Sequence, residues 1–421
     1  MPHTYRLPES GQSPEEVRAR LEGLRARDVT WADGTVFSLV FAAGREVSAV
    51  AREAYAMFMA ENGLNPSAFP SLRQMETEVV AMTAGLLGGA EAAGNMTSGG
   101  TESILMAVKT ARDWARATRP RIRRPELVMP VTAHPAFDKA AHYFDVRLVK
   151  VPVDGSFRAD LRALRKAISG NTIMLVGSAP AYPHGAIDPI AAIAGLAAER
   201  EILCHVDACV GGFFLPFLRG LGRDVPPFDF AVPGVTSMSV DLHKYGYAAK
   251  GASVVLYRSA ALRRHQLFAA TDWPGGIYAS PTMTGTRPGG AIAAAWAVMQ
   301  HLGRAGYERL AGAVMEAVDR LRAGVAAIPG LRILGEPAMS ILALAGDGLD
   351  IYAVGDELAA RGWHLDRQQS PPSLHLTINA VHVAHIERFL ADLRAAAEQA
   401  RARGGQRRAA LLHATVRLAA T

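Results

Sequence analysis

Ser239-Val-Asp-Leu-His-Lys-Tyr-Gly246 places a lysine directly after a histidine, at the end of a largely apolar run. That run, Val235–Val240, has the length and composition of a buried strand. Two polar stretches upstream occupy similar positions. His205-Val-Asp-Ala-Cys209 ends another strand-like run, and Thr97-Ser-Gly-Gly-Thr-Glu-Ser103 begins a helical pattern. Polar residues at strand ends and at a helix start are typical of a ligand site in an α/β protein.

Short β-rich runs alternate with helical segments through the middle of the chain. The expected strands are Leu127–Val131, Arg147–Val151, Thr172–Gly177, Ile202–Val206, Val235–Val240 and Ser253–Tyr257. The expected helices are Thr101–Ala117, Asp160–Ala167 and Ile190–Arg200. Such alternation predicts an α/β fold in which helices flank a mostly parallel central sheet. Ligands of these sheets bind beyond the carboxyl ends of the strands.

The pattern changes after Gly290, which predicts a second, smaller α+β domain. We expect an N-terminal helical and extended segment over residues 1–70, a large ligand-binding domain over 71–290, a small domain over 291–403 and a tail over 404–421. The small domain begins with a helical stretch over residues 291–327. Its expected strands and helices are Leu331–Leu334, Ser340–Ala345, Tyr352–Arg361, Leu374–Ile378 and His385–Ala400.

Composition argues against several classes of protein. The 421 residues carry a net charge of +6 that is diffuse except near the C-terminus, which disfavours a nucleic-acid partner. Two cysteines are too few for a disulfide framework and suit a reducing compartment. The N-terminus lacks the order of a signal peptide, and no apolar run approaches the ~20 residues of a membrane span. We therefore expect a cytoplasmic protein with no membrane span, and no metal site.

Lys244 is the candidate anchor for a cofactor. Pyridoxal 5′-phosphate chemistry needs a lysine that binds the cofactor aldehyde and is released when a substrate amine replaces it. A lone lysine would be a solvated charge, but this one follows an apolar strand. His243 can donate to the cofactor phosphate, or it can be a buried structural histidine. Asp207 can keep the pyridine nitrogen protonated, or it can cap the turn that precedes Gly211.

The turn Ser98-Gly99-Gly100-Thr101 is the candidate phosphate site. Small residues allow backbone N–H groups to approach an anion at a helix N-terminus, where the helix dipole favours negative charge. Thr101 adds a hydroxyl group. An ordinary helix start could have the same sequence, so the prediction depends on the residues downstream.

Three further residues could complete the site. His134 follows the strand that ends near Val131 and could stack on one face of the cofactor ring, or it could be structural. Cys209 could pack on the other face, and packing is expected in place of thiol chemistry. Lys250 could bind a substrate anion or move a proton, or it could be a surface lysine.

With these residues in place, the chain resembles the sphingosine-1-phosphate lyases. These enzymes belong to the group II decarboxylase branch of fold-type I pyridoxal phosphate enzymes. The resemblance extends from about Gly34 to Ala396, and the absence of a membrane anchor suits the soluble bacterial type. The matching stretches are NMTSGGTESILM from Asn95, PHGAIDP from Pro183, DLHKYGYAAKG from Asp241, TDWPGGIYASPT from Thr271 and GWHLDRQQSPPSLH from Gly362.

The resemblance implies a role for each candidate residue. Lys244, Asp207 and Lys250 are expected to act in catalysis. The expected cofactor-binding residues are Ser98, Gly99, Gly100, Thr101, His134, Asp207, Cys209, His243 and Lys244. The resemblance also implies a homodimer with active sites at the interface, in which Thr284-Gly285-Thr286-Arg287 reaches the cofactor phosphate of the neighbouring subunit.

Two positions depart from the family pattern. Asn65, in Asn62-Gly-Leu-Asn-Pro, stands where the family has a histidine, and Phe41 stands where the family has a tyrosine. In the family both side chains face the substrate. Asn65 can hydrogen-bond a phosphate but cannot be cationic, and Phe41 cannot transfer a proton. Phe41, Asn65, Tyr182 and His184 are the substrate candidates.

The leading hypothesis is a pyridoxal phosphate-dependent carbon–carbon lyase that acts on a phosphorylated long-chain amino alcohol such as sphingosine-1-phosphate. Loss of the 3-hydroxyl proton would break the C2–C3 bond and release a fatty aldehyde and phosphoethanolamine. The departures at Phe41 and Asn65 favour two alternatives, an amino-acid decarboxylase or a lyase for a different β-hydroxy amine. A third alternative is a non-catalytic protein that keeps the cofactor as structure, and the complete lysine–aspartate–histidine set argues against it.

Overall fold

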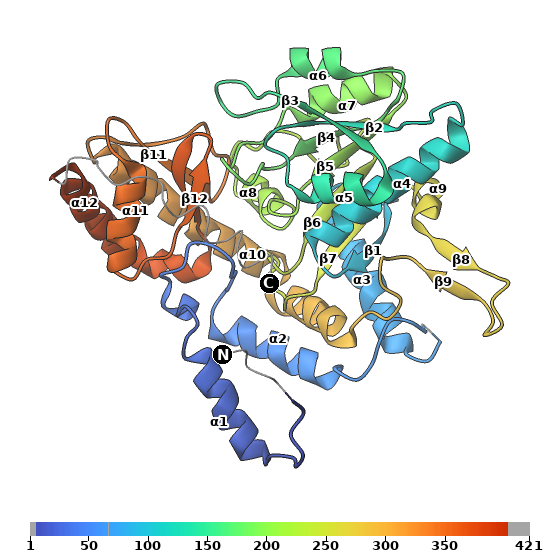
Figure 1. Ribbon diagram of the computed structural model, residues 1–421, viewed down its shortest axis with the longest axis horizontal. Coiled ribbons are helices and arrows are strands. Elements are labelled where there is room, and N and C mark those ends of the chain that lie inside the picture. Colours follow the sequence, from blue (N-terminus) through green and yellow to red (C-terminus); the bar gives the residue numbers. More distant parts are fainter. Residues whose placement is uncertain (1–5, 66, 403–421) are drawn as a thin grey trace.

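A seven-stranded sheet forms the centre of the protein (Figure 1). The computed structural model describes residues 6–65 and 67–402. The strands of this sheet are β1 Ala93–Thr97, β2 Glu126–Pro130, β3 Arg147–Val151, β4 Thr172–Ser178, β5 Leu203–Asp207, β6 Ser237–Asp241 and β7 Ser253–Tyr257. Their order is β1-β7-β6-β5-β4-β2-β3, and only β7 pairs antiparallel with its neighbours. The predicted mostly parallel sheet is confirmed.

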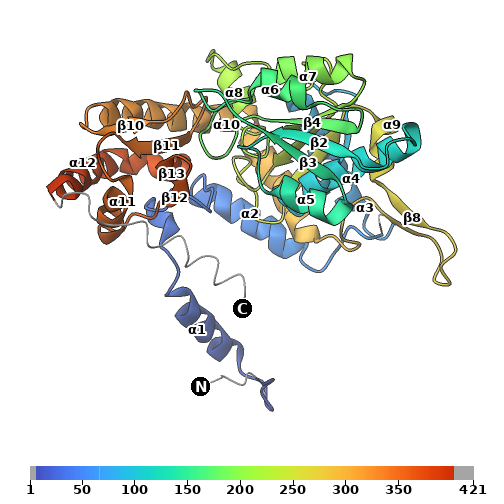
Figure 2. The same ribbon diagram turned by 45° about the horizontal axis from the view of Figure 1, so that its top comes forward.

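Helices cover both faces of this sheet, as Figures 1 and 2 show. Alternate residues of each strand point to opposite faces, so that Leu127 and Met129 join one buried cluster and Val128 joins the other. Every residue of β2 and of β4 to β7 is buried, which explains their nearly continuous apolar sequences. The main covering helices are α4 Gly100–Thr118, α5 Ala136–Phe144, α6 Leu161–Ala167, α7 Ile190–Glu199 and α8 Leu215–Gly220.

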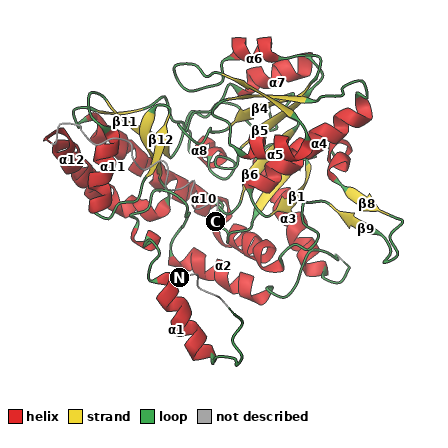
Figure 3. Ribbon diagram, viewed as in Figure 1, coloured by secondary structure: helices red, strands yellow, loops and turns green. Residues whose placement is uncertain are grey.

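A four-stranded antiparallel sheet follows toward the C-terminus (Figure 3). Its strands and helices are β10 Leu331–Ile333, β11 Ile341–Gly346, α11 Ile351–Ala360, β12 Asp366–Gln369, β13 Pro372–Thr377, η3 Ala380–His385 and α12 Ile386–Ala402. The smaller α+β unit therefore has the predicted elements, plus β12. The exact domain boundaries stay a prediction, and the predicted tail lies outside the described residues, as does residue 403.

The long helix α10, Gly289–Ala326, connects the two sheets, with one non-helical residue at Gly303. The N-terminal part contains α1 Pro14–Arg25, η1 Trp31–Asp33, α2 Arg45–Met57 and α3 Pro70–Leu86. Between β7 and α10 lie α9 Ala260–Arg263, η2 Arg264–Gln266, and the hairpin of β8 Phe268–Ala270 and β9 Tyr278–Ser280, which projects from the body. Within the described ranges, no helix has both the length and the apolar character that a bilayer crossing requires.

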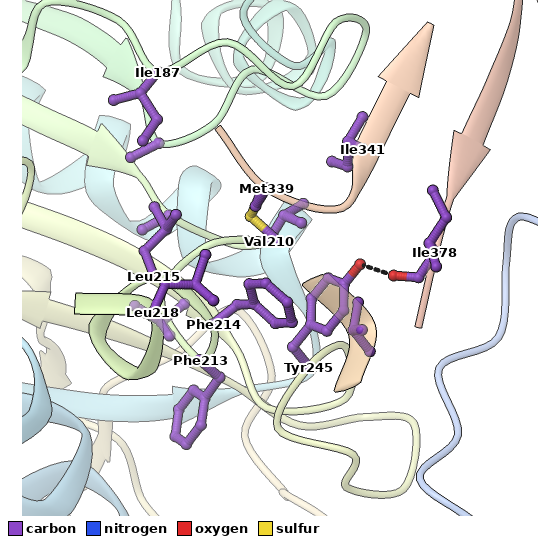
Figure 4. Packing of buried hydrophobic residues seen from close by; sticks show 14 of the residues in the cluster. Ile187, Val210, Phe213, Phe214, Leu215, Leu218, Tyr245, Met339, Ile341 and Ile378 are labelled. Atoms are coloured by element: carbon purple, nitrogen blue, oxygen red, sulfur yellow. Dashed lines mark hydrogen bonds between the residues drawn. The ribbon is translucent and has the colours of Figure 1, made fainter. Parts of the chain in front are cut away.

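The buried core continues from the large sheet into the small one (Figure 4). Val210 and Phe214 of the large unit pack near Met339 and Ile341, which precede and begin β11. Tyr245 is fully buried in this contact, and its hydroxyl donates a hydrogen bond of 2.7 Å to the carbonyl oxygen of Ile378. Because Tyr245 is adjacent to Lys244, this anchor restricts the backbone that carries the lysine.

Candidate active site

A cavity of about 460 Å³ lies where the carboxyl ends of β4, β5 and β6 meet the start of α4. This is the position at which parallel sheets bind ligands. The cavity is lined by Leu39, Phe41, Ser98, Gly99, Gly100, Thr101, Glu102, Ile104, His134, Ser178, Pro180, Tyr182, Asp207, Cys209, Val210, Asp241, His243, Lys244, Lys250 and Thr377. Three sequence motifs that are far apart in the chain therefore converge on one cavity.

Lys244 reaches this cavity from the turn after β6. Its Nζ lies 2.8 Å from Oδ2 of Asp241, the last residue of that strand. Burial alone would lower the pKa of Lys244, but the charge of Asp241 outweighs burial and raises that pKa above its ordinary value. Burial acts on Asp241 as well, yet Lys244 and His243 lower its pKa overall. The two groups therefore form an ion pair in which Asp241 is buried and Lys244 is partly exposed at the cavity.

Asp207 ends β5, and its carboxylate is fixed by neighbouring donors. Its Oδ1 accepts hydrogen bonds from the backbone N–H of Cys209, at 3.1 Å, and from the hydroxyl of Ser239, at 3.3 Å. The side chain is buried but still lines the cavity. A carboxylate held in this way can accept a hydrogen bond from a protonated ring nitrogen of a ligand.

The phosphate turn begins α4. Its N-cap, Gly99, makes no side-chain capping bond, so this helix start is not closed by its own cap. A Cβ on Gly100 would lie 2.7 Å from Sγ of Cys209 and 2.8 Å from Oδ2 of Asp241. Only glycine therefore fits beside these two side chains. A helix N-terminus that opens on a cavity is a favourable place for a phosphate.

His243 and Lys250 lie on either side of the turn that follows Lys244. His243 Nδ1 accepts from the backbone N–H of Ala252 at 3.3 Å, and burial lowers the pKa of His243. Lys250 Nζ donates to the carbonyl oxygens of Leu39, at 3.1 Å, and His243, at 3.4 Å. Burial, reinforced by the charge of Lys244, lowers the pKa of Lys250. A lowered pKa makes the neutral amine of Lys250 more available as a base.

His134 and Cys209 both line the cavity, as expected. His134 Nδ1 accepts a hydrogen bond of 3.1 Å from the backbone N–H of Ala136, which fixes the ring at the start of α5. Burial raises the pKa of the Cys209 thiol well above its ordinary value, and Asp207 adds to this rise. The thiol is therefore neutral, as expected for a packing residue.

Two of the four substrate candidates line the cavity. The ring of Phe41 packs edge-on against Tyr245, with centroids 4.9 Å apart, and Lys250 Nζ lies 5.6 Å from the Phe41 ring centre. Tyr182 stacks on His375 at 4.2 Å. Both positions are compatible with substrate contact.

The other two substrate candidates do not line this cavity. His184 is buried against Phe157, with ring centroids 3.9 Å apart, and neither of its nitrogens makes a hydrogen bond within the described residues. Burial lowers the pKa of His184 to about 4. Asn65 is exposed, and its Oδ1 accepts from the backbone N–H of Ser67 at 2.9 Å. A role for His184 at the substrate would need access that its packing does not give.

Thr284 and Gly285 also lie outside the cavity that contains Lys244. Thr284 instead lines a small neighbouring space of about 20 Å³, together with Ser98 and Arg287. Its expected contact with a second subunit therefore stays a prediction.

Several lining residues were not predicted from the sequence. Asp241 lies within the motif that includes Lys244, so its carboxylate was a visible signal. Glu102 follows the Ser98–Thr101 turn in the sequence, and nothing in the local pattern marks it as a lining residue. Ser178, at the end of β4, has a buried hydroxyl without a hydrogen-bond partner among the described residues. Leu39 and Thr377 come from segments with no motif that could have marked them.

Similarity to known proteins agrees with this geometry. Residues 22–344 match the family described as the pyridoxal-dependent decarboxylase conserved domain. The chain is 48% identical over 408 residues to the sphingosine-1-phosphate lyase of Oryza sativa, covering 95% of this chain and 75% of that protein. It is 44% identical over 397 residues to sphingosine-1-phosphate lyase 1 of Rattus norvegicus, covering 93% and 70%. The chain belongs to the sphingosine-1-phosphate lyase family.

Solved structures agree with this family assignment. A sphingosine-1-phosphate lyase of Burkholderia pseudomallei superimposes with a TM-score of 0.92 at 43% identity, over 94% of this chain and 93% of that one. A glutamate decarboxylase of Lactobacillus brevis has a TM-score of 0.82 at 18% identity, over 94% and 95%, and so shows the fold alone. The expected fold-type I architecture is confirmed, and so is the expected lyase family.

The residues present fit pyridoxal 5′-phosphate, the cofactor of this family. Lys244 can hold the aldehyde, Asp207 can face the ring nitrogen, and the Gly99–Thr101 turn can bind the phosphate. Because Gly100 has no side chain, the start of α4 can pack directly beside Cys209 and Asp241 at the wall of the cavity. The cavity volume of about 460 Å³ is also in the range of small-molecule sites.

Proposed function

We propose that this lyase cleaves a phosphorylated long-chain amino alcohol such as sphingosine-1-phosphate into a fatty aldehyde and phosphoethanolamine. One observation carries the proposal. Lys244, Asp207, Lys250 and the turn at Gly100 surround one cavity, in a chain 48% identical to a sphingosine-1-phosphate lyase. Pyridoxal 5′-phosphate, when bound, supplies an electron-accepting ring beside the substrate amine.

Each residue of the cavity has a distinct part in this reaction. Lys244 would hold the cofactor aldehyde until a substrate amine takes its place. Asp207 keeps a proton on the ring nitrogen, which increases the capacity of the ring to accept electrons. Lys250 would take the 3-hydroxyl proton while the C2–C3 bond breaks, and its lowered pKa supports this role. Lys244, with its raised pKa, can return a proton to C2.

Phe41 makes Lys250 the main candidate for the proton transfer. A phenylalanine at this position cannot accept a proton, whereas the Lys250 amine lies 5.6 Å from its ring centre and lines the same cavity. The aromatic face of Phe41 would attract the ammonium form of Lys250, which is the form that results once the amine has taken a proton.

We further propose a homodimer with shared active sites in the cytoplasm. Asn65 and Thr284 are exposed and lie outside the chain's own cavity, so both side chains are accessible to a neighbouring subunit. The buried thiols of Cys204 and Cys209 suit a reducing compartment.

A substrate panel on the purified, cofactor-loaded protein tests the proposed function. Sphingosine-1-phosphate should yield a long-chain aldehyde and phosphoethanolamine in equal amounts, with no CO₂. The same sphingoid base without its phosphate should be a much poorer substrate.

The panel also includes aromatic and acidic amino acids, because Phe41 departs from the family tyrosine. A relative named probable L-tyrosine/L-aspartate decarboxylase, from Methanothermobacter thermautotrophicus, is 36% identical over 345 residues. Release of CO₂ from an amino acid, without aldehyde release from sphingosine-1-phosphate, would replace the lyase proposal by a decarboxylase.

A further inference from the structure

Glu102 connects two segments that are distant in the sequence. It lies in the first turn of α4 and is 6% exposed. Its Oε2 accepts a hydrogen bond of 2.6 Å from the backbone N–H of Ser98, in the phosphate turn. Its Oε1 accepts one of 2.9 Å from the backbone N–H of Met283, which lies between β9 and α10. Each carboxylate oxygen therefore holds a different segment.

A second carboxylate, the half-buried Glu76 of α3, ties the same Met283–Arg287 segment to β1, which leads into the phosphate turn. Its Oε1 accepts from the backbone N–H of Met96 at 3.1 Å, and it also forms an ion pair with Nη1 of Arg287. Arg287 Nη2 donates to the carbonyl oxygen of Gly63 at 3.1 Å. Met96 lies two residues before the phosphate turn. Residues 283–287 are therefore tied to this turn near both of their ends.

The two tied segments face each other across the small space of about 20 Å³ that Ser98, Thr284 and Arg287 line. No helix or strand includes residues 281–288, so side-chain contacts are important in placing this segment. Glu102 supplies acceptors to both sides of this space. Its carboxylate also lines the larger cavity, beside the turn at Gly100.

We propose that Glu102 is a positioning residue that fixes the Ser98–Thr101 turn against the Met283–Arg287 segment and so preorganises the phosphate site. This inference rests on the proposed function, because the anion in question is the cofactor phosphate. Glu102 does not bind the phosphate itself, since two anions repel each other. Glu102 accepts the hydrogen bond of the Ser98 N–H before any ligand binds. The turn is therefore already ordered, which lowers the conformational free-energy cost of phosphate binding.

The proposal is testable because the charge of Glu102 and its positioning role predict opposite changes in phosphate affinity. Glu102→Gln removes a negative charge beside an anion site, so electrostatics alone would tighten phosphate binding. Positioning predicts weaker binding, because glutamine offers a single acceptor oxygen for two N–H donors. Glu102→Asp keeps the charge but is one methylene shorter, so it cannot reach both donors and should behave like Glu102→Gln.

The experiment titrates the apo-protein with pyridoxal 5′-phosphate and, separately, with pyridoxal, which has no phosphate. We expect both Glu102 variants to bind pyridoxal 5′-phosphate about tenfold more weakly, or worse, since loss of one charge-assisted hydrogen bond costs about this much. Binding of pyridoxal should change by less than about twofold. The matched control is Glu126→Gln, another buried glutamate, at the start of β2 and so away from the strand ends that form the cavity; it should leave both affinities unchanged.

Hydrogen exchange gives a second measurement that does not depend on turnover. Peptides covering residues 281–287 should exchange faster in the Glu102 variants than in the native protein, whereas those covering β4 should not change. Unchanged or tighter binding of pyridoxal 5′-phosphate by Glu102→Gln would overturn the proposal. Equal weakening of both ligands would also overturn it, because Glu102 would then support the whole fold. Product analysis on the native protein tests the proposed function separately.

Discussion

At the scale of single residues, the ion pair of Lys244 with the buried Asp241 sets the chemistry of the site. Their contact of 2.8 Å keeps the lysine charged until a cofactor arrives. The pair also explains why Gly100 has no side chain, because a Cβ there would press on the Asp241 carboxylate. The Asp241 carboxylate therefore contacts both Lys244 and the start of α4 at Gly100, and so fixes their relative positions.

The first prediction concerns Lys244→Ala. Borohydride treatment of the loaded native protein should fix the cofactor to Lys244, and mass spectrometry of peptides should locate it there. Lys244→Ala should reduce turnover by at least ~10⁴-fold, because the anchoring and proton-returning amine is lost. Lys150→Ala is the control, since that lysine pairs with Asp138 on the surface. A reduced adduct on Lys250 would contradict the assignment of Lys244.

The second prediction concerns pH and His184. Burial lowers its pKa to about 4 from an ordinary 6.5, so the folded state binds fewer protons than the unfolded chain between these values. The stability that His184 provides is therefore complete above pH 6.5 and is lost as the pH falls toward 4. His184→Phe keeps the ring stacked on Phe157 but cannot titrate. It should reduce the acid-induced loss of unfolding free energy by roughly 2 kcal/mol.

Chemical denaturation at several pH values between 4 and 7.5 measures this effect. The exposed His142 supplies the control, because His142→Phe should leave the pH dependence as in the native protein. Both variants should keep some acid sensitivity, since burial also lowers the pKa of His205 and of His382, which neither variant changes. Parallel pH profiles for His184→Phe and the native protein would show that His184 does not titrate in this range. The turnover of His184→Phe also tests the substrate role that the sequence predicts for His184.

Single residues were predictable where a motif and a predicted strand end coincide. Lys244, Asp207 and Gly100 were found in this way, because the alternation of strands and helices fixes which strand ends meet. Glu102 was not, since its second hydrogen-bond donor is Met283, 181 positions away. Likewise, the burial of His184 results from Phe157, which belongs to another loop. Such contacts depend on tertiary packing, which a local pattern does not record.

At the scale of elements, the loop after β4 links the cavity to the small sheet. Gly185 lies in this loop with φ of 68°, and a Cβ there would lie 2.3 Å from the carbonyl oxygen of Ile341, at the start of β11. The backbone N–H of Ala338 donates to the Gly185 carbonyl oxygen at 3.0 Å. The loop that carries Tyr182 into the cavity is therefore placed by close backbone contact.

The third prediction compares two glycines with similar backbone angles. Gly222 has φ of 78°, and a Cβ there would meet nothing within 4 Å. Gly222→Ala should lower the unfolding free energy by about 1–2 kcal/mol, the cost of a left-handed alanine. Gly185→Ala bears the same strain and must also displace the backbone at Ile341, so the loss should be about 2–4 kcal/mol. Equal losses in urea unfolding would show that the loop is not held by this contact.

Elements were predictable when burial made their sequence apolar. The expected strands Arg147–Val151 and Ser253–Tyr257 have the same first and last residues as β3 and β7. The ends of the other expected strands differ from the observed ends by at most one or two residues. The two short hairpin strands β8 and β9 were missed, and so were β1 and β12. The sequences of β1 and β12, AGNMT and DRQQ, contain little apolar signal, and they are strands because they pair with β7 and β13.

At the scale of the whole molecule, two residues expected at an active site, Asn65 and Thr284, belong to neighbouring segments outside the chain's own cavity. Asn65 and Thr284 belong to segments that are paired through backbone hydrogen bonds, such as the one from the Gly63 N–H to the Arg287 carbonyl oxygen at 2.8 Å. Neither side chain lines the chain's own cavity. The paired segments therefore form one surface unit, and the proposed homodimer would bring this unit to the active site of the neighbouring subunit.

The last prediction tests this destination by complementation. Lys244→Ala removes the cofactor anchor but leaves Thr284 intact, whereas Thr284→Asp leaves Lys244 intact but places a negative charge where a phosphate is expected. If Thr284 serves the neighbouring subunit, a mixed dimer contains one site with both native residues. Unfolding and refolding the two inactive variants together should then restore about a quarter of the native activity, because half of the random dimers are mixed and each has one native site. The control is a mixture of the Lys244→Ala variant and a variant that carries both Lys244→Ala and Thr284→Asp. This mixture contains no native Lys244 and should restore no activity. If Thr284 acted on its own chain, no mixture would recover activity, and sedimentation of an active monomer would lead to the same conclusion.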